Sequence, residues 1–586
     1  MTDASAFKKP VTVHIDGRAI VAEAGTPLLQ VALDNGIEIP HYCYHPKLSI
    51  DGSCRMCQVK IEKAPKLQIA CNTPVTDGMI VDTTAPEVKH AREGVMELLL
   101  INHPLDCPIC DQAGECYLQD YSYGYGRGHS RTTSPRRKGV KRYPIGPRVI
   151  FDQERCILCR RCVRFTKEIS KTNELRVFGM GDRSRIGASA GRPLDNDYSI
   201  NTADICPVGA LLSADFHHKR RVWFLEETES VCPSCANGCN VKIGVFKNEI
   251  QRLLPRRNDA VNDTWMCDYG RLNYAFVHDE SRIRVPFVRD MPIAEEGAAP
   301  VASPGGNGAG PVAPTVDDAL AAAAVALRQS IEKHGAASVG VIVSPRLTNE
   351  ESFRLARLVH DVLKTPNVAL AVPLGASDDF LIKPEKVANA RGARDVGLVP
   401  ASSARDVAAI LAACAAGEVR ALWVVGSDDL AVVAGEEAAT SAVAGLEALI
   451  LHDTTRSPLT GLATVLIPGA TWAEKDGSFT NDAGRVQRIR RAVHPPEGLV
   501  ADGEVFARLA AALGAAGAAF DPRAAFDEMA AAVAPYRGMS LARLGSLGLP
   551  SAAADPSAST SSPATPSTAG PGAPPAPAPP SPPAGA

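Results

Sequence analysis

The sequence predicts a multidomain protein that combines small α+β domains in its first half with an α/β domain in its second half. Three observations lead to this fold class. Fifteen of the sixteen cysteines lie before residue 268, where they fall into four groups. Between residues 315 and 467, helical and strand patterns alternate, as in a mostly parallel sheet. Two stretches of biased composition mark boundaries between or after these regions.

Length and composition are those of a globular protein. The chain has 586 residues, 45% of them apolar, which is enough for several domains with real cores. Its net charge of -3 excludes a broad basic surface for nucleic acid. The first ten residues lack an apolar region, and no stretch approaches the roughly 18 apolar residues of a membrane span. We therefore expect a soluble, cytoplasmic protein without a signal peptide or transmembrane segment.

The chain begins with the pattern of a hairpin and a helix. Apolar residues alternate over residues 11–15, before an Asp-Gly turn at 16–17. Thr26 can cap the helix that follows, Pro27 fits its first turn and Gly36 suits its end. The residues predicted to share its apolar face are Leu28, Val31 and Ala32. A hairpin, a helix and a cysteine-bearing loop are the start of a small α+β domain.

Further elements follow the same reasoning. A second helix is predicted over about residues 86–102, with apolar residues at helical spacing just before the second cysteine group. In the distal region, Thr315 can cap a helix that begins with Asp317 and Asp318. The expected strands of the distal sheet are Val339–Val343, Leu422–Val425, Ala448–Leu451 and Thr464–Ile467. This alternation predicts an α/β domain with a mostly parallel sheet.

One segment is predicted to be a linker, one a disordered tail and one a charged loop. Residues 297–314 are an uncharged Gly/Ala/Pro linker, and from Ser551 onward the chain uses almost only Ala, Pro, Ser, Thr and Gly. Such a tail cannot bury enough apolar surface to offset ordering entropy, so it should be disordered. Residues 127–148 carry eight Lys/Arg and no acid. This segment is either a solvated loop or a docking or cluster-flanking element.

The first cysteine group lies on loops of the predicted amino-terminal domain. Its members are Cys43, Cys54, Cys57 and Cys71. Four thiolates on loops of a small domain suit a 2Fe-2S cluster, although the ten-residue gap after Cys43 differs from the gap in plant-type ferredoxins. A structural zinc ion and unrelated buried thiols are the alternatives.

The second group lies in the stretch NHPLDCPICDQAGEC. Its members are His103, Cys107, Cys110 and Cys116. Three thiolates within ten residues can wrap one cubane cluster. His103 is either a fourth ligand or a capping or surface histidine at a helix end. As a ligand, a neutral imidazole would remove negative charge and raise the cluster's potential.

The third group has the most specific spacing. Cys156, Cys159 and Cys162 form C-x2-C-x2-C, and Cys206-Pro207 supplies a remote fourth thiolate. Bacterial ferredoxins use this pattern for 4Fe-4S clusters. Single zinc ions favour two separated pairs, so three cysteines within seven residues favour a cubane.

The fourth group repeats the pattern with wider spacing. Its members are Cys232, Cys235, Cys239 and Cys267, and zinc is again the alternative to a cluster. Cys414 lies alone in a helical apolar stretch and is expected to be a buried core thiol.

The two common phosphate-binding fingerprints are missing. No G-x-G-x-x-G opens a helix after a strand, and no G-x-x-x-x-G-K-[ST] occurs. A nucleotide or flavin is therefore expected on a partner. No nucleophilic site is specific either, so we name no catalytic residue.

At these motifs the chain resembles the large iron-sulfur subunit of bacterial NADH-quinone oxidoreductase (respiratory complex I), which is the G subunit of that enzyme and the bacterial form of the 75 kDa subunit family. The resemblance rests on HYCYHPKL, GSCRMCQV, NHPLDCPICDQAGECYLQD, CILCRRCVRF and DICPVGAL, and it is most specific over about residues 10 to 225. It implies a 2Fe-2S cluster at the first group and 4Fe-4S clusters at the other three, and it makes His103 a ligand. Only some members of this family carry the fourth group.

The resemblance also implies a domain order. We expect a β-grasp 2Fe-2S ferredoxin domain at residues 8–88 and a ferredoxin-like 4Fe-4S domain at 89–225. A 4Fe-4S domain of the kind found in molybdenum and tungsten bis-MGD enzymes would follow at 226–290. After a linker at 291–315, a molybdopterin-oxidoreductase-like α/β domain would span 316–540, before a disordered tail at 541–586.

The distal domain is expected to lack a pterin. The stretch VLIPGATWAEKDGSFTNDAGRVQ is similar to a motif of molybdopterin oxidoreductases. The domain is nevertheless much shorter than in working molybdenum enzymes, and Cys414 is poorly placed to bind metal. Arg271 also stands where those enzymes usually have lysine.

The family's role implies an electron-transfer subunit. Electrons would come from NADH through FMN on a flavoprotein partner and pass by neighbouring iron-sulfur subunits toward quinone, while the whole complex translocates protons. The chain would lie on the cytoplasmic side of the plasma membrane and meet the membrane arm only indirectly. The alternatives are a subunit of an NAD-linked molybdenum formate dehydrogenase, a hydrogenase diaphorase subunit, or a zinc-stapled scaffold protein.

Overall fold

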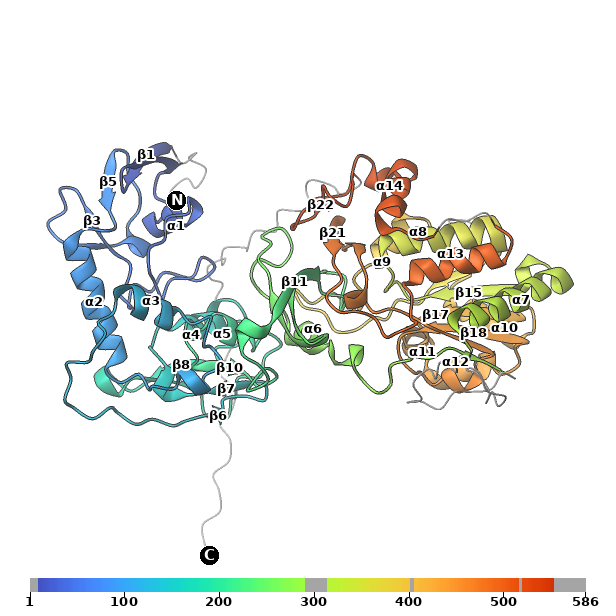
Figure 1. Ribbon diagram of the computed structural model, residues 1–586, viewed down its shortest axis with the longest axis horizontal. Helices are drawn as coiled ribbons and strands as arrows, with labels where there is room; N and C mark the ends of the chain where they lie inside the picture. Colours follow the sequence, from blue (N-terminus) through green and yellow to red (C-terminus); the bar gives the residue numbers. More distant parts are fainter. Residues whose placement is uncertain (1–8, 290–313, 401–404, 516–518, 553–586) are drawn as a thin grey trace, which may run out of the picture.

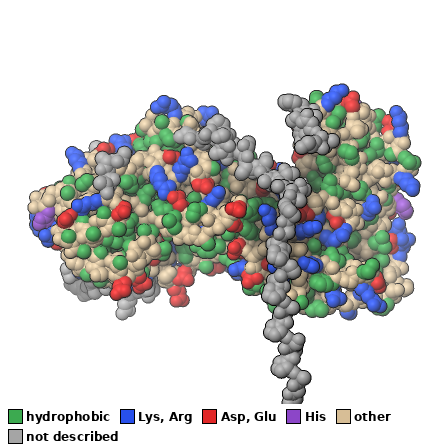
Figure 2. All heavy atoms as spheres, turned by 180° about the vertical axis from the view of Figure 1, so that it is seen from behind, with side chains coloured by type: hydrophobic (Ala, Val, Ile, Leu, Met, Phe, Trp, Pro, Cys, Tyr) green, Lys and Arg blue, Asp and Glu red, His purple; other side chains and the backbone are tan. Residues whose placement is uncertain are grey.

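The computed structural model describes residues 9–289, 314–400, 405–515 and 519–552. The molecule is elongated (Figure 1). Its cysteine-rich first half lies at one end, a large α/β domain lies at the other, and the strands around β11 join them. On the face drawn in Figure 2, basic and acidic side chains are intermixed, in keeping with the low net charge. The predicted linker lies almost wholly outside the described residues, and so does the predicted tail from residue 553 onward.

The first domain is a five-stranded sheet covered by one helix, and it begins with the predicted hairpin and helix. The strand order is β2-β1-β5-β3-β4, and β1 runs parallel to β5. Asp16 and Gly17 both have positive φ, 48° and 81°, as a tight hairpin turn requires. One core joins the helix to the sheet. The elements are β1 (Pro10–Ile15), β2 (Arg18–Glu23), α1 (Leu28–Asp34), β3 (Gln58–Ile61), β4 (Gln68–Ile69) and β5 (Met79–Asp82).

Two details of this domain differ from the predictions. Thr26 does not cap α1, because Pro27 takes the cap position with an extended backbone and bridges to Pro74. The second helix, α2 (Pro86–Leu100), ends two residues early. Its buried residues are Val88, Arg92 and Met96, whereas Leu98 is exposed.

The second region is built from short elements that leave most of its backbone in loops. Its main sheet has the order β10-β7-β6, and β8 and β9 form a separate hairpin. One short helix directly follows Cys116 and another contains Cys162. The elements are α3 (Tyr117–Tyr125), β6 (Tyr143–Pro144), β7 (Val149–Phe151), α4 (Arg161–Glu168), β8 (Leu175–Phe178), β9 (Arg185–Ala188), α5 (Asn201–Asp204) and β10 (Leu211–Ser213).

The third region is an antiparallel three-stranded sheet that packs on the distal domain. It consists of β11 (Glu226–Val231), β12 (Asn240–Phe246), β13 (Glu249–Pro255) and the short helix α6 (Asp268–Leu272). Gln487 of the distal domain donates to the Gly238 carbonyl at 2.9 Å, and Asn481 donates to the Asn237 carbonyl at 3.1 Å. One hydrophobic core runs across this junction.

The distal domain is a six-stranded sheet between two layers of helices. Its order is β14-β19-β18-β17-β15-β16, and all neighbours are parallel except β14 with β19. The four predicted strands are present, and the short edge strands β14 and β16 were not predicted. The strands are β14 (Phe287–Val288), β15 (Val339–Val343), β16 (Asn367–Leu370), β17 (Ala421–Val425), β18 (Ala448–Asp453) and β19 (Val465–Pro468).

Alternating side chains of this sheet build two separate cores. Val341, Trp423 and Ile450 face one helix layer, whereas Ile342 and Leu422 face the other. The first layer contains α7 (Val316–His334), α8 (Asn349–Arg357), α13 (Asp502–Ala512) and α14 (Pro522–Ala532). The second contains α10 (Val407–Ala415), α11 (Ser427–Ala434) and α12 (Glu436–Val443). A sheet buried on both faces explains the continuous apolar strand sequences.

The predicted start of α7 is confirmed, and the domain extends beyond its expected end. Thr315 accepts from the Asp318 backbone N–H, and the Asp318 carboxylate accepts in return, which forms a capping box. Leu541 and Leu544 are buried in the first core. The carboxyl-terminal strand β22 (Leu549–Pro550) pairs with β21 (Arg485–Ile489), whose other neighbour is β20 (Gly477–Thr480). Residues 541–552 are therefore folded, not part of the expected tail.

A buried ionic cluster holds the helix layer to the segment after β19. Lys475 Nζ lies 2.8 Å from Glu351 Oε2 and 2.5 Å from Asp502 Oδ2, and all three side chains are at most 5% exposed. Burial alone would lower the pKa of Lys475, but the two carboxylates outweigh it and raise that pKa. His452 adds a contact to Asp502 at 2.9 Å. The motif residue Lys475 is thus a structural cation in this fold.

Replacing Lys475 by methionine should strongly destabilise the distal domain, because it leaves two buried carboxylates without their cation. We expect a loss of about 3–5 kcal/mol, measured as the opening free energy of β15 and β17 amides by native-state hydrogen exchange. The control is Lys383→Met, which removes a half-exposed contact to Asp482 at 3.4 Å. That variant should change the opening free energy by less than about 1 kcal/mol. Equal effects of the two variants would contradict this account.

Candidate metal centres

The first cysteine group converges between α1 and β5. Cys43 follows α1, Cys54 and Cys57 precede β3, and Cys71 lies in a single turn after β4. The Cys43 thiol is within hydrogen-bond distance of the thiols of Cys54 and Cys71, and Cys57 reaches Cys71 in the same way. Hydrogen bonds from Cys54 and Cys71 lower the pKa of Cys43 despite its burial. The loops thus bring all four sulfur atoms to one place.

The second group lines a cavity of 640 Å³. His103, Cys107, Cys110 and Cys116 all face it. Burial, reinforced by the positive charge of Arg155, lowers the pKa of His103 to about 4, so its imidazole is neutral near pH 7. A neutral imidazole is the form that binds metal. The structure therefore places His103 with the three cysteines rather than on the free surface.

A glycine makes room for one sulfur of this group. A Cβ built on Gly209 would lie 2.2 Å from Cys110 Sγ, closer than non-bonded atoms allow. Gly209 follows the third group's Cys206 by three residues, so the same short segment of chain borders both groups. Cys116 Sγ also lies 4.0 Å from the Pro207 carbonyl oxygen.

The predicted basic segment forms part of the same cavity. Arg127, His129 and Arg136 are among its lining residues. Elsewhere the segment is exposed and held by ion pairs, such as Arg131 with Glu97 at 2.6 Å. Lys141 lies 3.0 Å from Glu154. The segment is thus both solvated and, at one end, beside the second group.

The third group is wrapped by a tight loop before α4. Leu158 and Arg160, which flank Cys159, both have left-handed backbones with φ of 55° and 58°. Such residues let three cysteines point inward from one short loop. Cys156, Cys159, Cys162 and Cys206 line one small cavity. Burial raises the pKa of Cys159 to about 11, so a thiolate there needs nearby positive charge.

The fourth group is buried at the junction with the distal domain. Its four cysteines are each at most 7% exposed. Cys267 caps α6, where its sulfur accepts from the Gly270 N–H at 3.3 Å. A Cβ on Gly270 would lie 2.9 Å from Cys232 Sγ and 3.3 Å from Cys267 Sγ. Asn237 donates to Cys239 Sγ at 3.0 Å.

Although single pairs of sulfur atoms lie close together, no three described cysteine sulfurs lie as near to one another as one zinc ion would hold them. A Zn–S bond of about 2.3 Å places neighbouring sulfur atoms of a tetrahedron about 3.8 Å apart. Among the described residues, which include all sixteen cysteines, no three cysteine sulfurs lie within 4.8 Å of one another. None of the cysteines forms a disulfide. The spacing fits a polynuclear cluster better than a single ion.

Buried arginines between the groups are the part of the site that the sequence analysis missed. Arg164 donates to the backbone carbonyls of Cys43 and of Cys159, the latter at 3.3 Å. Arg155 contacts Asp106, beside Cys107, at 3.1 Å. A signal was present, because basic residues flank the cysteines in ERCILCRRCVRF. Spacing alone did not show that their side chains point inward.

The other two residues singled out in the sequence have structural partners. Cys414 is buried in the second core of the distal domain, as predicted, and burial raises its pKa to about 12. Arg271 is buried and its Nη1 lies 3.0 Å from Asp204 Oδ1.

Models of known protein families match most of the chain in order. The matches are a 2Fe-2S iron-sulfur cluster binding domain at residues 8–86, an NADH-ubiquinone oxidoreductase-G iron-sulfur binding region at 92–131, an NADH-quinone oxidoreductase subunit 3 ferredoxin-like domain at 146–212, an NADH-ubiquinone oxidoreductase NDSU1/NuoG-like 4Fe-4S domain at 225–275 and a molybdopterin oxidoreductase domain at 375–512. Domains that bind 2Fe-2S and 4Fe-4S clusters are therefore present.

Curated relatives give the same result. The G subunit of NADH-quinone oxidoreductase from Rickettsia felis is 42% identical over 48% of this chain and 41% of its own length. The protein of the same name from Streptomyces coelicolor is 36% identical over 63% of this chain and 42% of its own length. The NADH-ubiquinone oxidoreductase 78 kDa subunit of Neurospora crassa is 44% identical over 48% of this chain and 38% of its own length. The matched region thus spans about two fifths of each relative.

Among the solved structures that match, one overlaps this chain in part. It is a chain of an NAD+-reducing [NiFe]-hydrogenase in the H2-reduced state, 30% identical over 36% of this chain and 91% of that one, with a TM-score of 0.33. In the order of its iron-sulfur domains and in its identity with the curated relatives, the chain is similar to the NADH-quinone oxidoreductase G subunit and the 75 kDa subunit over about two fifths of their length.

Proposed function

We propose that this chain is the large iron-sulfur electron-transfer subunit of an NADH:quinone oxidoreductase. The observation that carries the proposal is the convergence of four ligand groups within domains of the matching family. Electrons would arrive from NADH by way of a flavoprotein partner and leave toward quinone through other iron-sulfur subunits. Proton translocation would belong to the whole complex. No described helix is long and apolar enough to cross a membrane.

The ligand sets follow from the four groups. One 2Fe-2S cluster would be held by Cys43, Cys54, Cys57 and Cys71. Three 4Fe-4S clusters would be held by His103, Cys107, Cys110 and Cys116, by Cys156, Cys159, Cys162 and Cys206, and by Cys232, Cys235, Cys239 and Cys267. Bound iron-sulfur clusters supply one-electron transfer. The domain boundaries at residues 88, 225 and 290 belong to the same proposal.

The contacts support an order for three of the groups. Arg164 binds the backbone of Cys43 and Cys159 together, which links the first group to the third. The Pro207 carbonyl, next to Cys206, accepts from the Tyr117 N–H at 3.2 Å, which links the third group to the second. We infer that electrons pass from the first group to the third and then to the second. The fourth group, at the junction with the distal domain, would lie beside this path.

The surrounding protein would tune the sites by charge and hydrogen bonding. Buried guanidinium groups stabilise negative charge on nearby thiolates and sulfides, which favours the reduced state. At the second group, a histidine in place of a thiolate would also favour the reduced state, because it removes a negative charge. The chain's own residues thus bind, orient and shield the centres, and we assign no proton-transfer residue.

Metal content separates this proposal from its alternatives. The anaerobically purified chain should contain about 14 iron and about 14 acid-labile sulfide, without molybdenum and without zinc bound by the cysteine groups. The measurement is elemental analysis with a sulfide assay. Stoichiometric molybdenum would favour the formate dehydrogenase alternative, in which the distal domain does chemistry. A correctly matured protein with zinc and no iron would favour the scaffold alternative.

Replacing Cys159 by serine should remove the third cluster and interrupt transfer between the first and second. Iron should fall from about 14 to about 10 per chain, and NADH-quinone activity of the assembled complex should be lost. The matched control is Cys414→Ala, because this cysteine lies in the distal core and should leave the iron content unchanged. Full activity in the Cys159 variant would refute the assignment.

Replacing Gly209 by alanine should displace Cys110 and deplete the second cluster. The added Cβ would meet Cys110 Sγ at 2.2 Å, so iron should fall toward about 10 per chain. Gly128→Ala is the matched control, because Gly128 lines the same cavity and its Cβ would meet no atom within 4 Å. Iron analysis and the reduced-cluster EPR spectrum measure the outcome. Unchanged iron in the Gly209 variant would argue against Cys110 as a ligand.

A further inference from the structure

One cluster of metal-binding side chains lies outside the four cysteine groups. Asp111, His217 and His218 place a carboxylate oxygen and two imidazole nitrogens within 4.8 Å of one another. In the part of the chain that the structure describes, it is the one set of three or more such residues with this spacing. The histidines lie in the turn after β10, and Asp111 directly follows Cys110.

The distances are close to those of a first-row metal site. His217 Nδ1 lies 2.7 Å from Asp111 Oδ2, and His218 Nδ1 lies 3.8 Å from Asp111 Oδ1. Zinc bonds of about 2.0–2.1 Å to nitrogen and oxygen place neighbouring ligand atoms of a tetrahedron about 3.3 Å apart. One observed distance is shorter and the other longer than this value. All three ligand atoms lie within 4.8 Å of one another, so small side-chain rotations would bring them around one ion.

The backbone is already arranged to present both rings to the carboxylate. The His218 N–H donates to Asp111 Oδ2 at 3.0 Å. His218 has a left-handed backbone, with φ of 58°, which is uncommon for a residue other than glycine or asparagine. The two imidazole rings lie with their centroids 3.9 Å apart. Adjacent histidines thus point to one side of the chain, where they meet Asp111.

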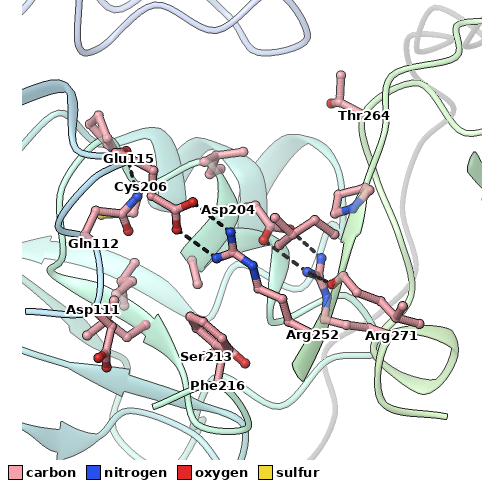
Figure 3. A pocket seen from close by; sticks show the side chains of 18 of the residues that line it. Asp111, Gln112, Glu115, Asp204, Cys206, Ser213, Phe216, Arg252, Thr264 and Arg271 are labelled. Carbon is pink, nitrogen blue, oxygen red and sulfur yellow. Dashed lines mark hydrogen bonds and ion pairs between the residues drawn. The ribbon is translucent and has the colours of Figure 1, made fainter. Parts of the chain in front are cut away.

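Asp111 is the acidic residue of this region that lacks a strong cationic partner. It lines a cavity of 490 Å³ together with Glu115 and Asp204 (Figure 3). Glu115 is bound by Arg252 at 2.9 Å, and Asp204 is bound by Arg271. Among the described residues, the ion pairs of Asp111 are with the two histidines alone. Its side chain is only 7% exposed, and a buried carboxylate without an arginine or lysine partner is a place where a bound cation would be stabilised.

The site is open on one side. The side chain of His217 is 17% exposed and that of His218 is 45% exposed. An ion bound by these three residues would keep at least one position for water. Figure 3 shows Asp111 on the side of the cavity near Ser213 and Phe216, away from Thr264. Cys110, the neighbour of Asp111, lines the separate cavity of the second cysteine group.

We propose that Asp111, His217 and His218 bind a divalent transition-metal cation of the zinc class, in addition to the four iron-sulfur sites. Two imidazoles and one carboxylate suit Zn²⁺ and its first-row neighbours, whereas Mg²⁺ and Ca²⁺ prefer oxygen ligands alone. The ion would offset the buried Asp111 charge and tie the turn after β10 to the loop of the second group.

The test is zinc binding by the full chain with its clusters in place. Equilibrium dialysis against Zn²⁺ under anaerobic conditions should give one zinc per chain, and excess Mg²⁺ should not compete. X-ray absorption at the zinc edge should show nitrogen and oxygen ligands at about 2.0–2.1 Å. A sulfur shell at about 2.3 Å would place the zinc in a cysteine group instead and would overturn the proposal.

Substitutions of the proposed ligands test where the ion binds. His218→Asn suits the left-handed backbone and removes the half-exposed imidazole, so the fold should be kept while zinc affinity falls by at least about 100-fold. Asp111→Asn should weaken binding likewise. His334→Ala is the matched control, because it removes a histidine–glutamate pair at 3.6 Å that belongs to no such set. Zinc binding unchanged by His218→Asn would overturn the proposal.

Iron and sulfide should be measured in the same samples as zinc. These values distinguish a failure of the zinc-site proposal from a failure of the electron-transfer proposal. About 14 iron with no bound zinc would refute the zinc site and leave the electron-transfer proposal intact. Zinc bound through nitrogen and oxygen in a chain without iron would refute the electron-transfer proposal and support this site.

Discussion

The desolvation of sulfur anions is the constraint on which the rest of this structure depends. Most of the grouped cysteines are nearly withdrawn from water, and burial raises the pKa of many of them, Cys232 to about 12 for example. A thiolate in such a place is stable only beside compensating charge or hydrogen-bond donors. The loops that hold the cysteines are therefore rich in N–H donors, inward arginines and left-handed residues, and their short helices and strands serve to fix those loops.

Between the cysteine groups, the side chains that supply positive charge and fix the loops are arginines rather than lysines. The Arg164 guanidinium reaches the backbone of two cysteines from different groups, and Arg161 reaches the Tyr44 and Ile205 carbonyls in the same way. A planar group with five donors can bind two separate loops at once, whereas an ammonium on a flexible stem cannot fix their relative orientation. The same side chains thus set the local charge and the relative position of neighbouring centres.

Local patterns predicted most of the regular structure. The hairpin at Asp16-Gly17, the capping box at Thr315 and the four central strands of the distal sheet follow from turn chemistry, capping and apolar runs, and all are present. The predictions were less accurate where tertiary contacts determine the local structure. Pro27 displaced Thr26 as the cap by bridging to Pro74, and β14 has only two residues, too few for a pattern. Cysteine spacing identified the four groups, whereas Asp111 and His217 lie 106 residues apart and only the fold brings them together.

The strand β14 connects the first part of the chain to the distal domain. It lies before the segment 290–313, yet it pairs with β19 of the distal domain. Nearby, Arg282 contacts the buried Glu474 at 2.6 Å, and the Ile283 N–H donates to the Thr454 carbonyl. The distal domain is thus completed by a strand that the preceding part of the chain contributes. A single proteolytic cut between Arg289 and Pro314 would divide the polypeptide while leaving two fragments that still hold each other, as complementing halves of one fold.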